Sequence, residues 1–234
     1  MKLNITDLTI ASKLLHEFVI NYSRFIPHNQ MQYIMERMLD DRYFTNPNLY
    51  PIYAHLGLLH DENNYYMQIK NLIVRKYNIG SNILEVGCGF FPTLSLMIDK
   101  EQKKVGSGSI TGYDPRVIST IGFGDTKLHN KIFDSNTDIS NFDLSVAVKP
   151  CEATEDFILN NNANKKPFIL GFCGCVHDGR KDPLKHTDKE TFAWINSTIS
   201  FAERTLPNGF VIHRGIIAYD TNKVLPVIRS ERIK

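Results

Sequence analysis

Residues 82–89 read Asn82-Ile83-Leu84-Glu85-Val86-Gly87-Cys88-Gly89, and they determine how the rest of the chain is interpreted. A short apolar run that ends in glycines is typical of a buried parallel strand followed by a tight turn. A helix-like stretch at 94–103 comes next, and the amino end of a helix offers free N–H groups to negative or polar ligand atoms. We therefore predict a ligand-binding turn after a central strand.

A second acidic position strengthens this interpretation. Asp114 follows the segment Thr111-Gly112-Tyr113, about one strand–helix–strand unit after the glycines. A Gly-x-Gly pair alone is a weak signal, but together with Glu85 before it and an acid after the next strand it indicates a nucleotide-type site.

The composition is that of an ordinary globular protein. The chain has 234 residues, of which 42% are apolar and 22% charged, with a net charge of +2, which suits one domain with an appendage or two small domains. It has no apolar run of about 20 residues, no signal-peptide core and four cysteines without a disulfide framework. These features predict a cytoplasmic protein without a membrane partner, and no basic arm for nucleic acid, although a basic patch formed only by the folded chain stays open.

The chain divides into two parts. Residues 1–78 show apolar stripes at helical spacing, which predicts an N-terminal helical cap. From residue 79 to 234 the pattern alternates between strand and helix, which predicts parallel strand–helix–strand units. Strands are expected at 83–86, 109–113, 131–133, 143–148 and 168–172, and helices around 93–103, 115–121 and 152–162.

The last part of the chain has a different pattern. A helix is expected at 189–206, followed by strands at 210–217 and 224–228, and the short turn between these strands requires an antiparallel hairpin. The predicted fold is α/β, with a mostly parallel seven-stranded sheet that begins in the order 3-2-1-4-5 and ends in this hairpin. The asparagine-rich segment 160–164 is expected to be an exposed turn.

Over residues 79–228 these features resemble the class I, Rossmann-like, S-adenosylmethionine-dependent methyltransferases. The resemblance implies that the glycine turn holds the methionine part of S-adenosyl-L-methionine and that Asp114 binds both ribose hydroxyls. A carboxylate suits that role because it accepts two hydrogen bonds at once. It also implies that Asp134, after the third strand, bonds the adenine amino group, although a lone Asp there is commonly a turn former. The implied cofactor-binding residues are Glu85, Gly87, Cys88, Gly89, Asp114, Asp134 and Lys149.

Nicotinamide and flavin enzymes of the Rossmann type are the main alternative, since they also need glycines after the first strand and an acid after the second. Their fingerprint has a third glycine that permits close packing of helix on strand. Pro92 stands at that position here, which favours the methyltransferase interpretation. In a further alternative Glu85 and Asp114 merely cap strand ends.

The segment after the fourth strand, 149–155, reads Lys-Pro-Cys-Glu-Ala-Thr-Glu. It is similar to the Lys-x-x-Cys-Gly-x-x-Thr-Asp run of a methyltransferase branch that includes tRNA ribose methyltransferases, but Glu152 replaces the glycine. That branch often has paired cysteines and a histidine after strand five, whereas here Gly174 separates Cys173 from Cys175 and the zinc-finger modules are absent. An Asn/Asp-Pro-Pro-aromatic tip is also missing, which makes amino methylation of nucleic-acid bases less favoured.

All four cysteines fall at the carboxyl ends of strands 1, 4 and 5, which are neighbours in the predicted order. They could pack a crowded rim, line a substrate pocket, or bind zinc or iron; without a Cys-x-x-Cys pair we predict no metal. Methyl transfer needs alignment of the acceptor and removal of its proton. We expect Lys149, Glu152 and His177 to face the acceptor, without assigning the base among them.

The sequence thus predicts a methyltransferase with an unidentified acceptor. A small molecule is mildly favoured over RNA, because RNA enzymes usually carry a basic stripe that contacts phosphates. A domain that binds the cofactor without catalysis is the alternative from another functional class.

Overall fold

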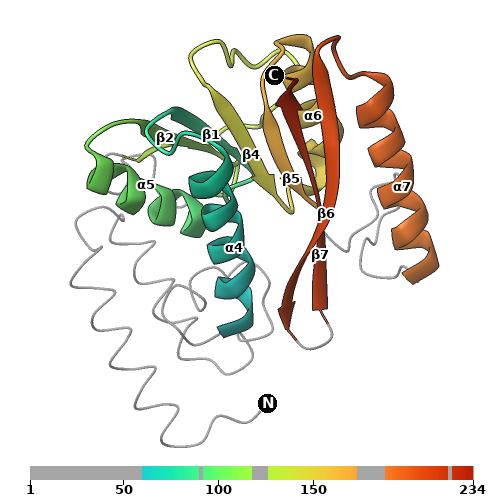
Figure 1. Ribbon diagram of the computed structural model, residues 1–234, viewed down its shortest axis with the longest axis horizontal. Coiled ribbons are helices and arrows are strands. Elements are labelled where there is room, and N and C mark those ends of the chain that lie inside the picture. The colour runs from blue at the N-terminus through green and yellow to red at the C-terminus, as the bar shows by residue number, and fades with distance from the viewer. Residues whose placement is uncertain (1–59, 90–91, 118–125, 173–187, 221–222, 234) are drawn as a thin grey trace, which may run out of the picture.

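The computed structural model describes residues 60–89, 92–117, 126–172, 188–220 and 223–233 (Figure 1). The elements in chain order are α4 (His60–Lys76), β1 (Asn82–Val86), α5 (Thr93–Val105), β2 (Ser109–Tyr113), β3 (Lys127–His129), β4 (Leu144–Val148), the 3-10 turn η2 (Cys151–Ala153), α6 (Thr154–Ala163), β5 (Phe168–Gly171), α7 (Asp188–Arg204), β6 (Phe210–Asp220) and β7 (Lys223–Arg232).

The strands form one seven-stranded sheet in the order β3-β2-β1-β4-β5-β7-β6. Strands β1 to β5 pair with one another in parallel, whereas β7 runs antiparallel to both β5 and β6. This arrangement confirms the predicted mostly parallel sheet and its closing hairpin. The hairpin is longer than predicted, because pairing continues to Asp220 and Lys223.

Helices cover both faces of the sheet (Figure 1). On one face, Ile69 and Ile73 of α4 and Ile98 of α5 share a core with inward residues of the strands. On the other face, Phe157 of α6 and Ile195 of α7 share a second core. Successive residues of β1 alternate between these two cores, as the two-residue period of a strand requires. Because both faces are covered, the central strands β1 and β4 are buried along nearly their whole length.

Helix α4 belongs physically to this sheet domain, although its residues fall within the predicted N-terminal cap. Tyr65 and Ile69 are 1% and 0% exposed and lie in the same core as Ile83 of β1. The division at residue 78 stays a prediction, because residues 1–59 lie outside the described part of the chain.

The prediction for the third strand was wrong. It was expected at 131–133, but β3 comprises residues 127–129, which pair with Thr111–Tyr113 of β2. Ile132 is 76% exposed, so the apolar pair Ile132-Phe133 contributes only Phe133 to the core. A three-residue edge strand is too short to show alternation. Of the helix predicted at 115–121, Pro115 and Arg116 form a turn and residues 118–121 lie outside the described part.

The asparagine run was also misinterpreted. Asn160, Asn161 and Asn162 are 0%, 0% and 5% exposed and lie within α6. The Asn160 amide donates to the carbonyls of Asp134 at 3.0 Å and Thr137 at 2.8 Å. Buried amides are tolerated when they find such partners, so polar composition did not indicate exposure here. Among the helices that the structure describes, none is long and apolar enough to cross a membrane.

Candidate functional site

The glycine turn joins the ends of three strands. Gly87 and Gly89 have φ angles of 72° and 78°, in the left-handed region that residues with a Cβ disfavour. The Gly87 N–H donates to the carbonyl of Tyr113 at 2.8 Å, which ties the end of β1 to the end of β2. A Cβ on Gly87 would lie 3.0 Å from Cα of Pro150, just after β4. The turn therefore packs closely between the end of β2 and the residues that follow β4.

Asp114 lies beside this turn with only 2% of its surface exposed. Its Oδ2 accepts from the Gly89 N–H at 2.9 Å, and its Oδ1 accepts from the Arg116 N–H at 2.7 Å. The Arg116 guanidinium adds bonds from Nε to Oδ1 at 3.1 Å and from Nη2 to Oδ2 at 3.2 Å. This ion pair raises the pKa of Arg116. The sequence did not single out Arg116; the available signal was the Asp-Pro-Arg order, which favours a side-chain-capped turn.

Glu85 is buried beneath the first turn of α5. The Ser95 hydroxyl donates to its Oε2, which links β1 to the helix that follows the glycine turn. The pKa of Glu85 is raised to about 7, chiefly by burial. The Ser95 hydrogen bonds favour the ionised form and oppose this rise, whereas the nearby negative charge of Asp114 contributes to it. Desolvation opposes the charged form of any carboxyl group. Ser95 is a second residue that the sequence did not single out.

Asp134 lies in an exposed turn after β3. Its Oδ1 accepts from the Asn136 N–H at 2.9 Å and from the Thr137 hydroxyl at 3.0 Å. The carboxylate thus stabilises its own turn, and Asn160 supports that turn from beneath. Its role toward adenine stays a prediction.

Lys149 and Glu152, predicted to face the acceptor together, contact different layers of the fold. Lys149 has a φ of 54°, and its Nζ lies 4.4 Å from the ring centroid of Tyr65 on α4. Glu152 is exposed in η2 and lines a hollow of about 210 Å³ together with Trp194 of α7. The end of β4 therefore presents one group to each side of the sheet. His177 lies outside the described residues.

The cysteine rim is only partly described. Cys88 is 3% exposed, and its Sγ would lie 3.0 Å from a Cβ on Gly112, so the thiol packs against β2. Burial raises the pKa of this thiol well above its ordinary value. Cys151 is half-buried in η2, and Cys173 and Cys175 lie outside the described part. Within that part, no group of three or more His, Cys, Asp or Glu side chains could hold a metal ion.

No family model matches the chain, and no curated protein sequence matches it. Solved structures do match. A 16S rRNA methyltransferase, RmtF, in complex with S-adenosyl-L-homocysteine aligns with 97% of this chain and 90% of its own, at 12% identity and a TM-score of 0.50. A putative O-methyltransferase from Klebsiella pneumoniae aligns with 87% of this chain and 96% of its own, at 11% identity and a TM-score of 0.50.

A cofactor-bound protein from MTB, Rv0187, is similar at 11% identity and a TM-score of 0.50, covering 82% of this chain and 90% of its own. At such low identity these likenesses establish the fold. Together with the strand order, they confirm that the chain has the Rossmann-like fold of class I methyltransferases.

Proposed function

We propose that this protein is an S-adenosylmethionine-dependent methyltransferase. The observation that carries the proposal is the buried carboxylate of Asp114, which Gly89 holds at the carboxyl end of β2 beside a turn of two left-handed glycines. Open α/β sheets bind their ligands beyond the carboxyl ends of the strands. The S-adenosyl-L-homocysteine in RmtF, a protein of the same fold, supports the choice of cofactor.

Residues at the ends of different strands would bind different parts of the cofactor. Asp114 would accept from the ribose hydroxyls, and the glycine turn, with Gly87, Cys88 and Gly89, would leave room for the methionine part. Glu85 orders this turn through Ser95 and α5. The remaining proposed cofactor contacts are Asp134 and Lys149. When bound, the cofactor supplies a methyl group on a positively charged sulfur.

The acceptor would approach the end of β4. Lys149 lies on the α4 side of that strand end and Glu152 on the α7 side, and His177 completes the predicted acceptor-facing set. These groups would orient the acceptor and remove its proton. If alanine at all three positions left turnover unchanged with cofactor bound, this placement would be wrong.

The acceptor class is a small molecule in our proposal, with RNA as the alternative. The net charge of +2 supports the small molecule, and neighbours of equal TM-score include both an rRNA methyltransferase and a putative O-methyltransferase. We also propose a cytoplasmic location, supported by four cysteines without a disulfide framework. A cofactor-binding protein without catalysis would bind S-adenosylmethionine but transfer no methyl group.

Calorimetry with S-adenosyl-L-homocysteine and with NADH tests the cofactor. We expect only S-adenosyl-L-homocysteine to bind. Asp114→Ala should weaken its binding free energy by about 2 kcal/mol or more, which raises Kd at least about thirtyfold, because the ribose loses hydrogen bonds to a charged acceptor. Asp138→Ala is the matched control, since Asp138 is an exposed turn residue that caps Ser140. NADH binding, or an unchanged Kd in Asp114→Ala, would refute the proposal.

A further inference from the structure

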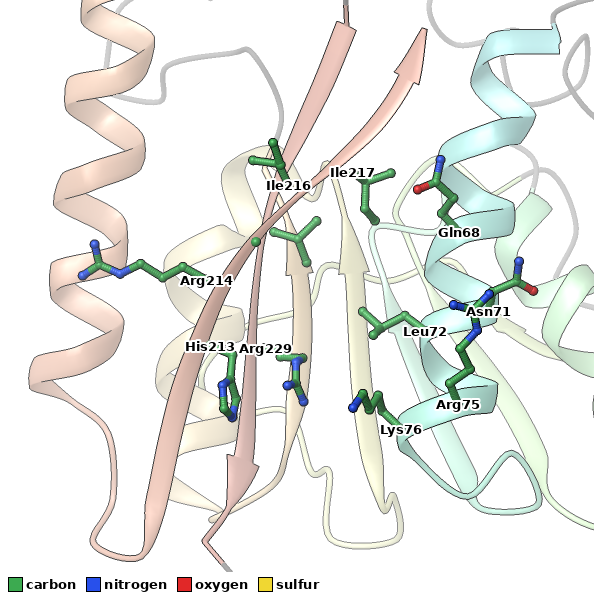
Figure 2. Close-up of a pocket in the computed structure, with 12 residues that line it drawn as sticks. Gln68, Asn71, Leu72, Arg75, Lys76, His213, Arg214, Ile216, Ile217 and Arg229 are labelled. Carbon is green, nitrogen blue, oxygen red and sulfur yellow. The ribbon is translucent and has the colours of Figure 1, made fainter.

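A groove of about 550 Å³ lies between α4 and the β6–β7 hairpin (Figure 2). Its volume is within the range of small-molecule sites in proteins. The described lining includes no residue of the glycine turn, neither Asp114 nor Lys149, and nothing from η2. The groove is therefore separate from the site proposed for methyl transfer.

The two ends of the groove differ in chemistry. At one end, Figure 2 shows Lys76 of α4 pointing toward Arg229 and His213 on the hairpin. Leu72 of α4 lies beside Lys76, and Ile217 of β6 lies toward the other end; both add aliphatic surface to the lining. Leu72 supplies the accessible part of this aliphatic surface because it is only half-buried, whereas Ile217 is 8% exposed and forms its floor.

The cationic end carries excess positive charge. Glu231 lies 2.6 Å from Nε2 of His213 and also pairs with Arg229, so one carboxylate serves two basic groups. In the part of the chain that the structure describes, Lys76 forms no ion pair, and the residues that line the groove include no carboxylate. Arg214 adds no charge here, since its guanidinium turns away and bonds Glu203 at 2.6 Å (Figure 2).

We propose that this groove is a second ligand site for a small anionic amphiphile, a molecule with one phosphate or carboxylate group and an apolar body. The anionic group would lie between Lys76 and Arg229, and the body would lie on Leu72 and Ile217. An inorganic anion would leave the aliphatic surface uncovered. A single RNA strand fits less well, because such strands stack their bases on aromatic side chains, and the described lining contains no Phe, Tyr or Trp.

The test is calorimetry on the full chain without S-adenosylmethionine. Octyl phosphate and octanoate each combine an anionic group with an apolar body, inorganic phosphate carries the anionic group alone, and octanol carries the body alone. We expect at least one amphiphile to bind about tenfold tighter than either part alone. Lys76→Ala should weaken that binding about fivefold through loss of a charged contact. Arg214→Ala is the matched control and should bind as the wild type does. Comparing octyl phosphate with octanoate identifies the preferred anionic group.

Leu72→Asn should weaken binding of the amphiphile but not of inorganic phosphate, and a thermal melt of each variant shows that it is folded. Three results would overturn the proposal: no amphiphile binding, inorganic phosphate that binds as tightly as octyl phosphate, or equal losses in Lys76→Ala and Arg214→Ala. The proposal would also be overturned, in favour of nucleic acid, if a 20-nucleotide RNA bound more tightly than either amphiphile and Lys76→Ala abolished that RNA binding. A parallel titration with S-adenosyl-L-homocysteine tests the cofactor proposal separately. The two proposals can fail independently, because the two sites share no described residue.

Discussion

Arg116 competes for the carboxylate of Asp114 that the ribose hydroxyls would need. The Arg116 side chain donates to both carboxylate oxygens, and the N–H groups of Gly89 and Arg116 donate one bond each. An ionised carboxylate has about four acceptor positions, so all are in use. The two backbone donors are held by the turn, whereas the Arg116 side chain is 56% exposed. Ribose binding would therefore displace the guanidinium.

Arg116→Ala is expected to tighten binding of S-adenosyl-L-homocysteine. Because the Arg116 side of this pair is exposed, we take its contribution as about 1 kcal/mol, so Kd should fall about fivefold. Calorimetry measures the change, and Lys131→Ala, which removes another exposed cation, controls for general charge effects. Weaker binding in Arg116→Ala would instead mean that Arg116 contacts the cofactor.

Ionisation of Glu85 should lower the free energy of unfolding as the pH rises. The pKa of Glu85 is about 7 in the folded protein and 4.5 as its ordinary value, so the folded state holds the proton more tightly. The stabilisation is complete below pH 4.5 and is lost as the pH rises through about 7. At about 1.4 kcal/mol per pH unit, the loss is about 3 kcal/mol.

Urea unfolding between pH 4.5 and 8 checks this dependence, with Glu85→Gln as the comparison. Glutamine keeps the shape and still accepts from Ser95 but does not titrate. The free energy of unfolding of the wild type should fall relative to that of Glu85→Gln across this interval. Parallel pH profiles for the two proteins would show that Glu85 stays ionised.

Gly87→Ala and Gly89→Ala should differ in their cost. Both residues have left-handed φ angles, and a Cβ there costs roughly 1–2 kcal/mol. At Gly87 the new atom also meets the backbone of Pro150 at 3.0 Å, whereas at Gly89 nothing lies within 4 Å. Urea unfolding should therefore show a larger loss for Gly87→Ala. Equal losses would mean that the glycine turn does not press on the end of β4.

Asn160→Ala should destabilise the turn that carries Asp134. The substitution removes the two hydrogen bonds that the buried amide donates to the carbonyls of Asp134 and Thr137, and the one that its oxygen accepts from Asn164. We expect a loss of about 2 kcal/mol in the free energy of unfolding. Asn141→Ala, at an exposed position, is the control. A loss no larger than the control's would contradict the role assigned to Asn160.

The sequence by itself determined the sheet and the meeting point of its central strands. Apolar runs of strand length, interrupted by helical spacing, define parallel units, and a short turn between two late strands requires a hairpin. The signals at Glu85, Gly87 and Asp114 were weak one by one and informative only in combination, because glycines and acids at strand ends also form ordinary turns. These residues converge because parallel strands place their carboxyl ends at one edge.

Only the tertiary structure decided the features that depend on partners far away in the chain. The position of β3 follows from pairing with β2, and the amides of Asn160 and Asn162 donate to carbonyls that lie 23 to 40 residues away. Lys149 is directed to α4 and Glu152 to the α7 side by contacts that no local pattern contains. The groove between α4 and the hairpin likewise joins segments about 140 residues apart. Sequence periodicity reports which face of an element is buried, but the partner on that face is set by packing in three dimensions.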